Sequence, residues 1–565
     1  MAGHFSAAKE AMFAVRARMN HDAMIYFIAA IASMAVVFVI HHFLRLGAGK
    51  MKKVHVPSPL LAVTRKIRFF SIRKVPALPS MGHAGLVSLY VITNIVLMFA
   101  HVDYKNMALV PNLASRTGWL AIANMVLVVF LALKNTPLAF LTSWSYERLN
   151  VLHQVSGCMT LIHVILHASC YSAYFVLDGR SSRLLQVEEI YGMVAGISFL
   201  ALVFSGVVIR PFWYELFYYT HISFWIVGIV MVGLHQPEIS KKIIFATCVA
   251  GGIWVLDRLV RMARVAMYSF SNEATLHPLP NGGTRITLKK APMGAKSGKH
   301  CFLWIPKIRS CETHPFTIAS ADPVEFVIAS YDGFTRDLHQ YALKNPGVSL
   351  KASVDGPYGT FPPPTDCDEM ILVAGGSGAS FVFGAALNAL KVMAADEMKR
   401  ITIIWTVKQQ SQLQWFSRHI RALQAEERVS IHLYVTQPPT LEGVPGTPND
   451  ESQKEKNDSP NVTVMTNLER EPLPRLNTHL SFDSEKGSQS ESDAPSSIQN
   501  APIEYKRPDV PAMIRAKIDE TPVDKRVLIM GCGPDGLIRA VRNTGSECIR
   551  ADGPAVEIHC EQFGW

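Results

Sequence analysis

Four histidines in the N-terminal half of the chain have a spacing that suits metal ligation. His153 and His167 are fourteen residues apart, and so are His221 and His235. At about 100° and 1.5 Å per residue, fourteen residues of α-helix return to within about 40° of the same face and rise about 21 Å. Each segment therefore presents two imidazoles on one face at two depths.

Two imidazoles at the same depth on neighbouring helices can supply both axial ligands of one haem, an arrangement that suits electron transfer. Ionisable side chains inside a membrane are costly and usually functional. We predict a pair His153–His221 near one face of the membrane and a pair His167–His235 near the other. The alternative, imidazoles that serve polar contacts only, is weakened by the repeated spacing. His163 has no partner at that spacing, so we interpret it as a packing or supporting residue.

These histidines lie in a succession of apolar segments of about 20 residues, the length with which a helix crosses about 30 Å of hydrocarbon. The segments lie near 23–44, 82–101, 116–135, 151–174, 190–209, 216–235 and 242–260. The first is long enough to span rather than to be a cleaved signal. Between 46 and 81 the chain carries eight Lys and Arg and no Asp or Glu, so the positive-inside rule puts this loop in the cytosol. Spans four and six then run parallel, and the C-terminal half is cytosolic.

The composition fits a mixture of membrane and soluble parts. The chain of 565 residues is 49% hydrophobic and 18% charged, and its mean hydropathy is +0.18. These values exclude a disordered chain and disfavour an entirely soluble enzyme. The formal charge of +10 is explained mainly by the loops, so we expect no nucleic-acid partner. Nine Cys without a CxxC pair do not indicate a disulfide scaffold or a zinc module.

After about residue 265 the pattern changes to that of a soluble protein. Short alternating segments predict a small antiparallel barrel over 268–362. From 369 apolar strands alternate with helices, which predicts a parallel doubly wound sheet. GGSGAS (375–380) and GCGP (531–534) each follow such a strand. Glycines there let the backbone approach a pyrophosphate at a helix N-terminus, although ordinary loop chemistry explains such turns as well.

One stretch of this half lacks apolar periodicity. Residues 437–508 are rich in Pro, Ser, Asp, Glu and Asn, so we predict a disordered insertion between two strands of the sheet. Both a regulatory role and an inert linker remain open for it.

HPFTIAS at 314–320 completes a set of motifs. His-Pro-Phe-Thr in a barrel strand, GGSGAS, GCGP and a terminal aromatic residue, behind paired membrane histidines, resemble the ferric reductase and NADPH oxidase superfamily, and most of all the fungal plasma-membrane ferric/cupric reductases. The resemblance covers about 82–565 apart from the insertion. The additional first span and the polar insertion are also similar to the fungal enzymes.

The resemblance implies the residues that hold the cofactors. FAD would be held by His314, Pro315, Phe316, Thr317, Ile318, Ala319 and Ser320 of the strand and by Gly333, Phe334, Thr335 and Arg336 of the following turn. The NADPH phosphates would lie against Gly375, Gly376, Ser377, Gly378, Ala379 and Ser380, and the nicotinamide against Gly531, Cys532, Gly533 and Pro534. Cys532 is alternatively a small buried residue.

Two further positions take roles from the same resemblance. Trp565 would stack on the flavin until the nicotinamide displaces it. Lys408 stands where the family often has Arg, and it would contact the 2′-phosphate of NADPH without bidentate geometry. The preference for NADPH over NADH therefore stays open.

The implied fold is an α-helical membrane bundle of about seven transmembrane helices followed by a ferredoxin-NADP-reductase-like module, which comprises an antiparallel β-barrel FAD domain and an α/β doubly wound NADPH domain. We expect four regions. Residues 1–81 form a first span with its basic loop, 82–265 a six-helix di-haem domain, 266–364 the FAD barrel, and 365–565 the NADPH domain with its insertion at about 437–508.

The implied function is a plasma-membrane metalloreductase embedded in the lipid bilayer. Electrons would pass from cytosolic NADPH through FAD and two b-type haems to extracellular chelated Fe³⁺ or Cu²⁺, for uptake by a separate transport system. Two rivals are an NADPH oxidase that reduces dioxygen to superoxide and a seven-span receptor without enzymatic activity. The two nucleotide motifs disfavour the receptor.

Overall fold

The computed structural model describes residues 7–50, 58–76, 78–235, 241–393, 399–437, 502–550 and 552–561. They divide into two compact units. The membrane unit contains the described residues up to Met267 together with Tyr358–Pro362, and the reductase unit contains Tyr268–Pro357 and the described residues from Pro363 onward. Trp565 and residues 438–501 of the predicted insertion lie outside the described residues.

The membrane unit is built on seven helices that are long and apolar enough to cross a bilayer, among the residues described. They are α1 (Ala7–Lys50), α3 (Met81–Phe99), α4 (Leu109–Ala132), α6 (Tyr146–Leu177), α7 (Val187–Phe204), α8 (Tyr214–Leu234) and α9 (Lys241–Tyr268). Each of the seven predicted spans coincides with one of these helices, so the prediction of a multi-pass membrane protein is confirmed.

Two shorter helices were not predicted. The basic loop contains α2 (Ser58–Ile72), and α5 (Pro137–Thr142) precedes α6. The helix α5 begins at Pro137 because the Thr136 side chain accepts a hydrogen bond from the Leu138 N–H, and it ends at Ser143 in the left-handed region. Such short helices lack the apolar length on which the prediction of spans depended.

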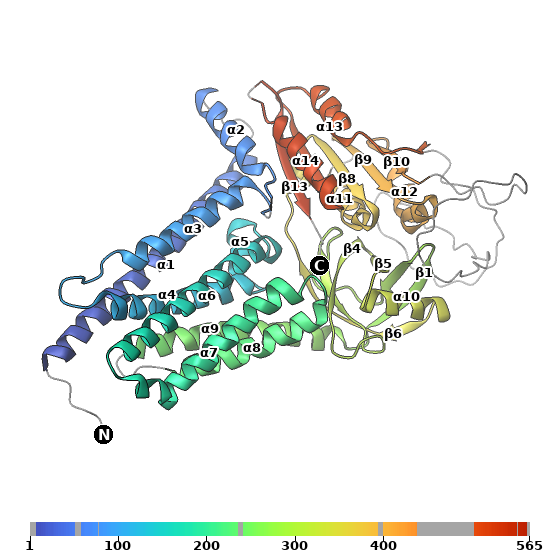
Figure 1. The fold of residues 1–565 in the computed structure, drawn as a ribbon. Coiled ribbons are helices and arrows are strands. Elements are labelled where there is room, and N and C mark those ends of the chain that lie inside the picture. The colour runs from blue at the N-terminus through green and yellow to red at the C-terminus, as the bar shows by residue number, and fades with distance from the viewer. Residues whose placement is uncertain are drawn as a thin grey trace, which may run out of the picture. The chain divides into compact units, whose positions relative to one another are not determined.

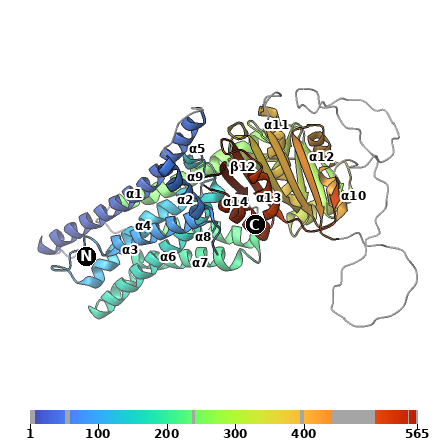
Figure 2. The ribbon, with the colours of Figure 1, turned by 90° about the horizontal axis from the view of Figure 1, so that it is seen from above.

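The bundle packs through two clusters of buried side chains. One joins α1, α3, α4 and α6 through Phe27, Tyr90, Leu120 and Met159, and these helices lie side by side in both views (Figures 1 and 2). The other joins α4, α7, α8 and α9. Large apolar side chains such as Ile92 remain exposed on the outside of the bundle, as a hydrocarbon surrounding requires.

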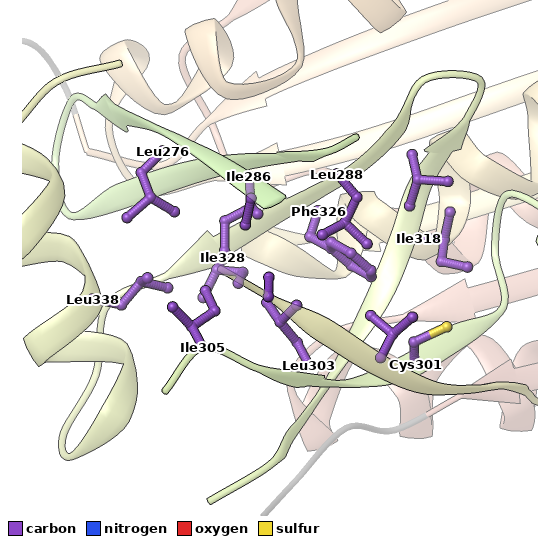
Figure 3. Packing of buried hydrophobic residues seen from close by; sticks show 14 of the residues in the cluster. Leu276, Ile286, Leu288, Cys301, Leu303, Ile305, Ile318, Phe326, Ile328 and Leu338 are labelled. Carbon is purple, nitrogen blue, oxygen red and sulfur yellow. The ribbon is translucent and has the colours of Figure 1, made fainter. Parts of the chain in front are cut away.

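The first part of the reductase unit is an antiparallel sheet of seven strands in the order β6-β1-β2-β5-β4-β3-β7. The strands are β1 (Glu273–Leu279), β2 (Gly283–Leu288), β3 (His300–Trp304), β4 (His314–Ala321), β5 (Val324–Ala329), β6 (Ser349–Lys351) and β7 (Ser353–Tyr358). Alternate residues such as Leu276, Ile286 and Phe326 are fully buried, and they form the core that Figure 3 shows. Helix α10 (Phe334–Lys344) adds Leu338 and Ala342 to this core.

The second part is a parallel sheet in the order β11-β10-β9-β8-β12-β13. Its strands are β8 (Glu369–Gly375), β9 (Arg400–Val407), β10 (Val429–Val435), β11 (Ile503–Glu504), β12 (Arg526–Cys532) and β13 (Ala555–Glu561); its helices are α11 (Ala379–Val392), α12 (Ser417–Gln424), α13 (Val510–Asp519) and α14 (Asp535–Glu547). The predicted fold class is therefore confirmed. The strand order reverses between β8 and β12, and ligands of such sheets bind at this point, beyond the carboxyl ends of the strands.

The predicted end of the insertion is wrong by several residues. We expected the polar segment to run to residue 508, but Ile503 and Glu504 pair with Leu433 and Tyr434 as the sixth strand. Two residues are too short to give a periodic pattern, and the neighbouring strand β10 supplies the hydrogen bonds that hold them.

Candidate functional site

The structure brings the predicted histidines together in pairs. The ring centroids of His153 (α6) and His221 (α8) are 6.4 Å apart, and those of His167 and His235 are 6.1 Å apart. The rings of each pair are inclined by 62° and 80°. Their role as haem ligands stays a prediction, but their pairing agrees with the spacing argument.

Every one of these imidazoles is oriented by a backbone carbonyl. The Nδ1 atoms of His153 and His167 lie 3.0 and 2.8 Å from the carbonyl oxygens of Val128 and Ala114 on α4. A carbonyl only accepts, so Nδ1 carries the proton and Nε2 keeps its lone pair for a ligand.

The second histidine helix repeats this arrangement on α7. The Nδ1 atoms of His221 and His235 lie 3.1 and 2.7 Å from the carbonyl oxygens of Leu202 and Glu188. Like the histidines, the two acceptors on each supporting helix are fourteen residues apart. Support of the non-ligating ring nitrogen is typical of metal-binding histidine.

The pairs have the dimensions that a shared metal requires. An imidazole nitrogen binds a metal at about 2.0 Å, and the ring centroid lies about 1.2 Å behind it, so two rings on opposite sides of one ion have centroids about 6.4 Å apart. The observed distances of 6.4 and 6.1 Å match this value. Among the described residues no group of three or more His, Cys, Asp or Glu could hold a metal ion. A planar porphyrin leaves two axial positions of its metal open, and each histidine pair offers two ligands.

His163 belongs to a buried polar network inside the bundle. Its Nε2 lies 3.1 Å from the Asn94 side-chain oxygen, to which Asn124 donates at 2.7 Å, and Tyr90 donates to Asn124. This hydrogen bond agrees with the interpretation of His163 as a packing or supporting residue.

The two predicted FAD motifs meet at one edge of the barrel. The His314 ring stacks on Phe334 at 4.4 Å between centroids. Residues 314–317 of β4 are partly exposed, and α10 begins at Phe334 after Gly333, whose φ is 59°. The Thr335 hydroxyl accepts from the Tyr331 N–H at 2.9 Å. A strand edge beside a helix N-terminus suits a dinucleotide pyrophosphate.

Several of the predicted FAD residues are buried, and two of them, Ile318 and Phe334, belong to the barrel core. Ile318, Ala319 and Phe334 are at most 1% exposed, and Ser320 is also buried. Their side chains hold β4 and α10 in place and would not face a ligand. Arg336, by contrast, is 54% exposed, so its guanidinium is available to a phosphate.

The two glycine turns pack against each other at the switch point of the parallel sheet. A Cβ on Gly378 would lie 2.4 Å from the Cys532 carbonyl oxygen, and one on Gly375 would lie 2.7 Å from Pro534. Gly376 has φ +55° and Gly533 has φ +157°. The Trp405 indole N–H donates to the Gly376 carbonyl at 3.0 Å. These glycines therefore allow a close approach of two backbones at the edge where nucleotides bind.

The remaining predicted nucleotide residues differ in their exposure. Lys408 is exposed directly after β9, the strand beside β8. Cys532 is only 2% exposed, and burial raises the pKa of its thiol far above the usual range. Ala379 is buried, and the Ser380 hydroxyl donates to the Val327 carbonyl at 3.2 Å. Cys532 therefore resembles a packed structural residue, and a contact with a nicotinamide stays a prediction.

One buried cation in the membrane unit was missed. Arg116, 1% exposed, donates to the Asn20 side chain and to the carbonyl oxygens of Leu97, Ala100 and His101 at 2.6–2.8 Å. It ties α4 to α1 and to the end of α3. Its charge inside a predicted span was the signal that could have identified it.

Three family models match the chain in the order of these structural parts. They describe a ferric reductase like transmembrane component (residues 117–232), an FAD-binding domain (267–361) and a ferric reductase NAD binding domain (367–546). The matched residues include three of the four paired histidines, His153, His167 and His221, and both glycine turns.

Similar proteins come from fungi. The chain is 26% identical over 485 residues to ferric reductase transmembrane component 3 of Saccharomyces cerevisiae (82% of this chain, 63% of the relative). It is 25% identical to ferric/cupric reductase transmembrane component 2 of the same yeast (80% and 61%), and 24% identical to a probable cell surface ferric reductase of Aspergillus oryzae (64% and 54%). The chain thus spans about three fifths of the two yeast relatives. The chain thus contains these three domains in this order, and its homologues are fungal ferric/cupric reductase transmembrane components.

Proposed function

We propose that this protein is a transmembrane one-electron reductase that takes hydride from NADPH on the cytosolic side and reduces chelated ferric iron, or cupric copper, outside the plasma membrane. The observation that carries the proposal is the pair of neighbouring imidazoles at each of two depths, all four oriented through Nδ1 by backbone carbonyls. The names of the fungal relatives support the choice of metal as acceptor.

When bound, FAD would supply the conversion of a two-electron hydride donor into single-electron steps, and haem iron would supply one-electron transfer. The chain contributes binding and orientation, since no proton-transferring triad or protein nucleophile is required.

In the membrane unit the four histidines would hold two haems at different depths. His153 and His221 would hold the inner one, and His167 and His235 the outer one. Fourteen residues of helix correspond to about 21 Å along the bundle axis. The two sites thereby bridge the hydrocarbon, which an electron cannot cross without carriers.

In the reductase unit the chain would bind FAD along the His314–Thr317 edge, with the N-terminus of α10 and Arg336 opposite the pyrophosphate. The glycine turns after β8 and β12 would receive the nicotinamide dinucleotide, and Lys408 its 2′-phosphate. We further propose that Trp565 covers the flavin ring in the absence of nicotinamide and that Cys532 lies at the nicotinamide end.

Purified protein provides the test. We expect two b-type haems per chain by the pyridine haemochrome assay, one FAD, and NADPH-driven reduction of chelated Fe³⁺ that superoxide dismutase does not inhibit. Superoxide production without any reduction of chelated Fe³⁺ in the presence of the dismutase would instead identify an oxidase.

A pair of variants on one helix links this activity to the histidines. His167→Ala should remove the outer haem and iron reduction while NADPH still reduces FAD. His163→Gln, which keeps a hydrogen bond to Asn94, is the matched control and should retain both haems. Full iron reduction by the His167→Ala protein would refute the two-haem path.

A further inference from the structure

Two glycines on the supporting helices lie directly beneath the outer imidazoles. A Cβ added to Gly118 of α4 would lie 2.6 Å from Nδ1 and 2.8 Å from Cε1 of His167. A Cβ on Gly192 of α7 would lie 2.6 Å from Cε1 and 2.7 Å from Nδ1 of His235. At each glycine the three nearest atoms all belong to that one imidazole. The imidazole ring therefore occupies the space that a methyl group at this position would need.

The position of these glycines follows from helix geometry. His167 donates to the Ala114 carbonyl and His235 to the Glu188 carbonyl, and each glycine is the fourth residue after that acceptor. In an α-helix the carbonyl of residue i points toward residue i+4. A ring that donates to this carbonyl therefore lies near residue i+4, and at Gly118 and Gly192 it lies so close that a Cβ would displace it.

The inner pair does not have this restriction. The residue four positions after Val128 is Ala132, so His153 is accommodated beside a methyl group. The residue four positions after Leu202 is Gly206, but a Cβ there would meet only a Phe217 ring carbon at 3.9 Å. Of the four paired histidines, the two outer ones are thus those whose rings lie against a glycine that has no room for a side chain.

Helix propensity gives no reason for glycine at either position. Glycine in a helix interior is less favourable than alanine. Helix–helix packing is not the reason either, because no backbone atom of a neighbouring helix is among the closest contacts of Gly118 or Gly192.

We propose that Gly118 and Gly192 are positioning residues that set the outer imidazoles at the separation and tilt in which both Nε2 atoms bind one haem. The inference rests on the proposed function, since it assumes that His167 and His235 are ligands. A methyl group at either glycine would break the Nδ1 hydrogen bond and turn Nε2 away, whereas the inner pair would stay intact.

The experiment compares Gly118→Ala and Gly192→Ala with Gly196→Ala, one turn further along α7. A Cβ at Gly196 meets only Val164 at 3.7 Å, an ordinary contact, so it is the matched control. We expect haem per flavin to fall by about half in each of the two variants, with loss of one low-spin haem signal in electron paramagnetic resonance. The control should keep both haems, and NADPH should still reduce FAD in all three proteins. Two haems with unchanged signals and midpoint potentials in Gly118→Ala would overturn the proposal.

A double variant separates the steric effect from misfolding. In the His167→Ala background the ring is absent, so adding Gly118→Ala should lower neither the remaining haem content nor the thermal stability. A further loss there would indicate a general structural role of Gly118 and would overturn the proposal. If the wild-type protein binds no haem, the proposed function fails; if it binds two and the glycine variants keep both, only the present inference fails.

Discussion

The exposed Lys408 is the residue from which a choice between the two nicotinamide cofactors can be argued. It lies at the carboxyl end of β9, next to the strand that carries the first glycine turn. A hydrogen bond to a charged group contributes about 1.5–3 kcal/mol, and exposure places this contact at the low end. We expect Lys408→Ala to raise KM for NADPH about tenfold and to leave KM for NADH unchanged, measured as the rate of flavin reduction.

Lys391 provides the matched control for this prediction. It is an exposed lysine in the last turn of α11, and because that helix starts at the glycine turn, its last turn lies away from the nucleotide edge. Lys391→Ala should change neither KM. An equal loss of affinity for both nucleotides in Lys408→Ala would instead assign Lys408 to a contact that NADPH and NADH share.

A buried histidine of the reductase unit predicts how stability depends on pH. His419 is 1% exposed between the rings of Phe383 and Phe416. Burial, together with the charges of Arg285 and Arg418, lowers its pKa to about 3. The unfolded chain takes up a proton below about 6.5 and the folded chain does not, so stability is full above 6.5 and falls as the pH decreases toward 3.

The expected loss is about 1.4 kcal/mol per pH unit below 6.5. We predict that the temperature of flavin release from the whole protein falls between pH 7.5 and pH 5.0, and that it falls less in His419→Phe. At pH 7.5 the imidazole is neutral in both states, so that condition is the internal control. The same decrease in both proteins would exclude His419 as its origin.

At the residue scale, the sequence was sufficient to predict which imidazoles meet, because the helix period is a property of the backbone. It was not sufficient to predict what orients them. Ala114 and Glu188 orient the imidazoles through backbone carbonyl oxygens, which every residue has. Gly118 contributes only by having no side chain, which leaves room for the ring. Such contributions become visible only when a second helix is placed beside the first. Phe334 shows the converse case, since the side chain of this motif residue is buried in the core, and its proximity to FAD stays a prediction.

At the scale of elements, the glycine turns depend on the pairing of β8 with β12. This pairing fixes both backbones, and the Cβ of Gly378→Ala would meet the Cys532 carbonyl oxygen at 2.4 Å and the Gly533 nitrogen at 3.1 Å. Neither atom belongs to a side chain that could move aside. We expect a loss of about 1–3 kcal/mol in the stability of the reductase unit and a raised KM for NADPH.

Gly536 in the first turn of α14 is the control for this variant, since a Cβ there meets nothing within 4 Å. Denaturant unfolding followed through the flavin should show Gly536→Ala at least as stable as the wild type, because alanine favours the helix. A fully stable Gly378→Ala protein would contradict the close approach of the two turns.

The elements that sequence patterns predicted best were those with a long period. Seven apolar segments and the alternation of strands with helices gave the spans and the fold class. The helix α2 and the strand β11 were missed because each depends on neighbours: α2 packs on α3, and β11 pairs with β10. Local composition, which is basic in the first case and polar in the second, indicated only a loop.

At the scale of the whole molecule, the proposed function requires that electrons cross the bilayer in one direction. The basic loop and Arg261 and Arg264 after the last predicted span predict that the reductase unit is cytosolic. Two histidine pairs about 21 Å apart along the helices then connect the two faces. Reduction should therefore occur only when NADPH and the metal chelate are on opposite sides of the membrane.

Proteoliposomes test this arrangement. With NADPH outside and an impermeant ferric chelate inside, vesicles whose reductase units face outward should produce Fe²⁺ in the lumen. With both reagents outside the same vesicles, production should fall to the level of protein-free vesicles, because the acceptor has no access to the distal histidine pair. Detergent should restore it by opening both faces. His167→Ala should abolish lumenal Fe²⁺ while external NADPH is still bound. Equal rates with both reagents on one side would show that electrons leave from the flavin, and the membrane path would then be excluded as the route to the metal.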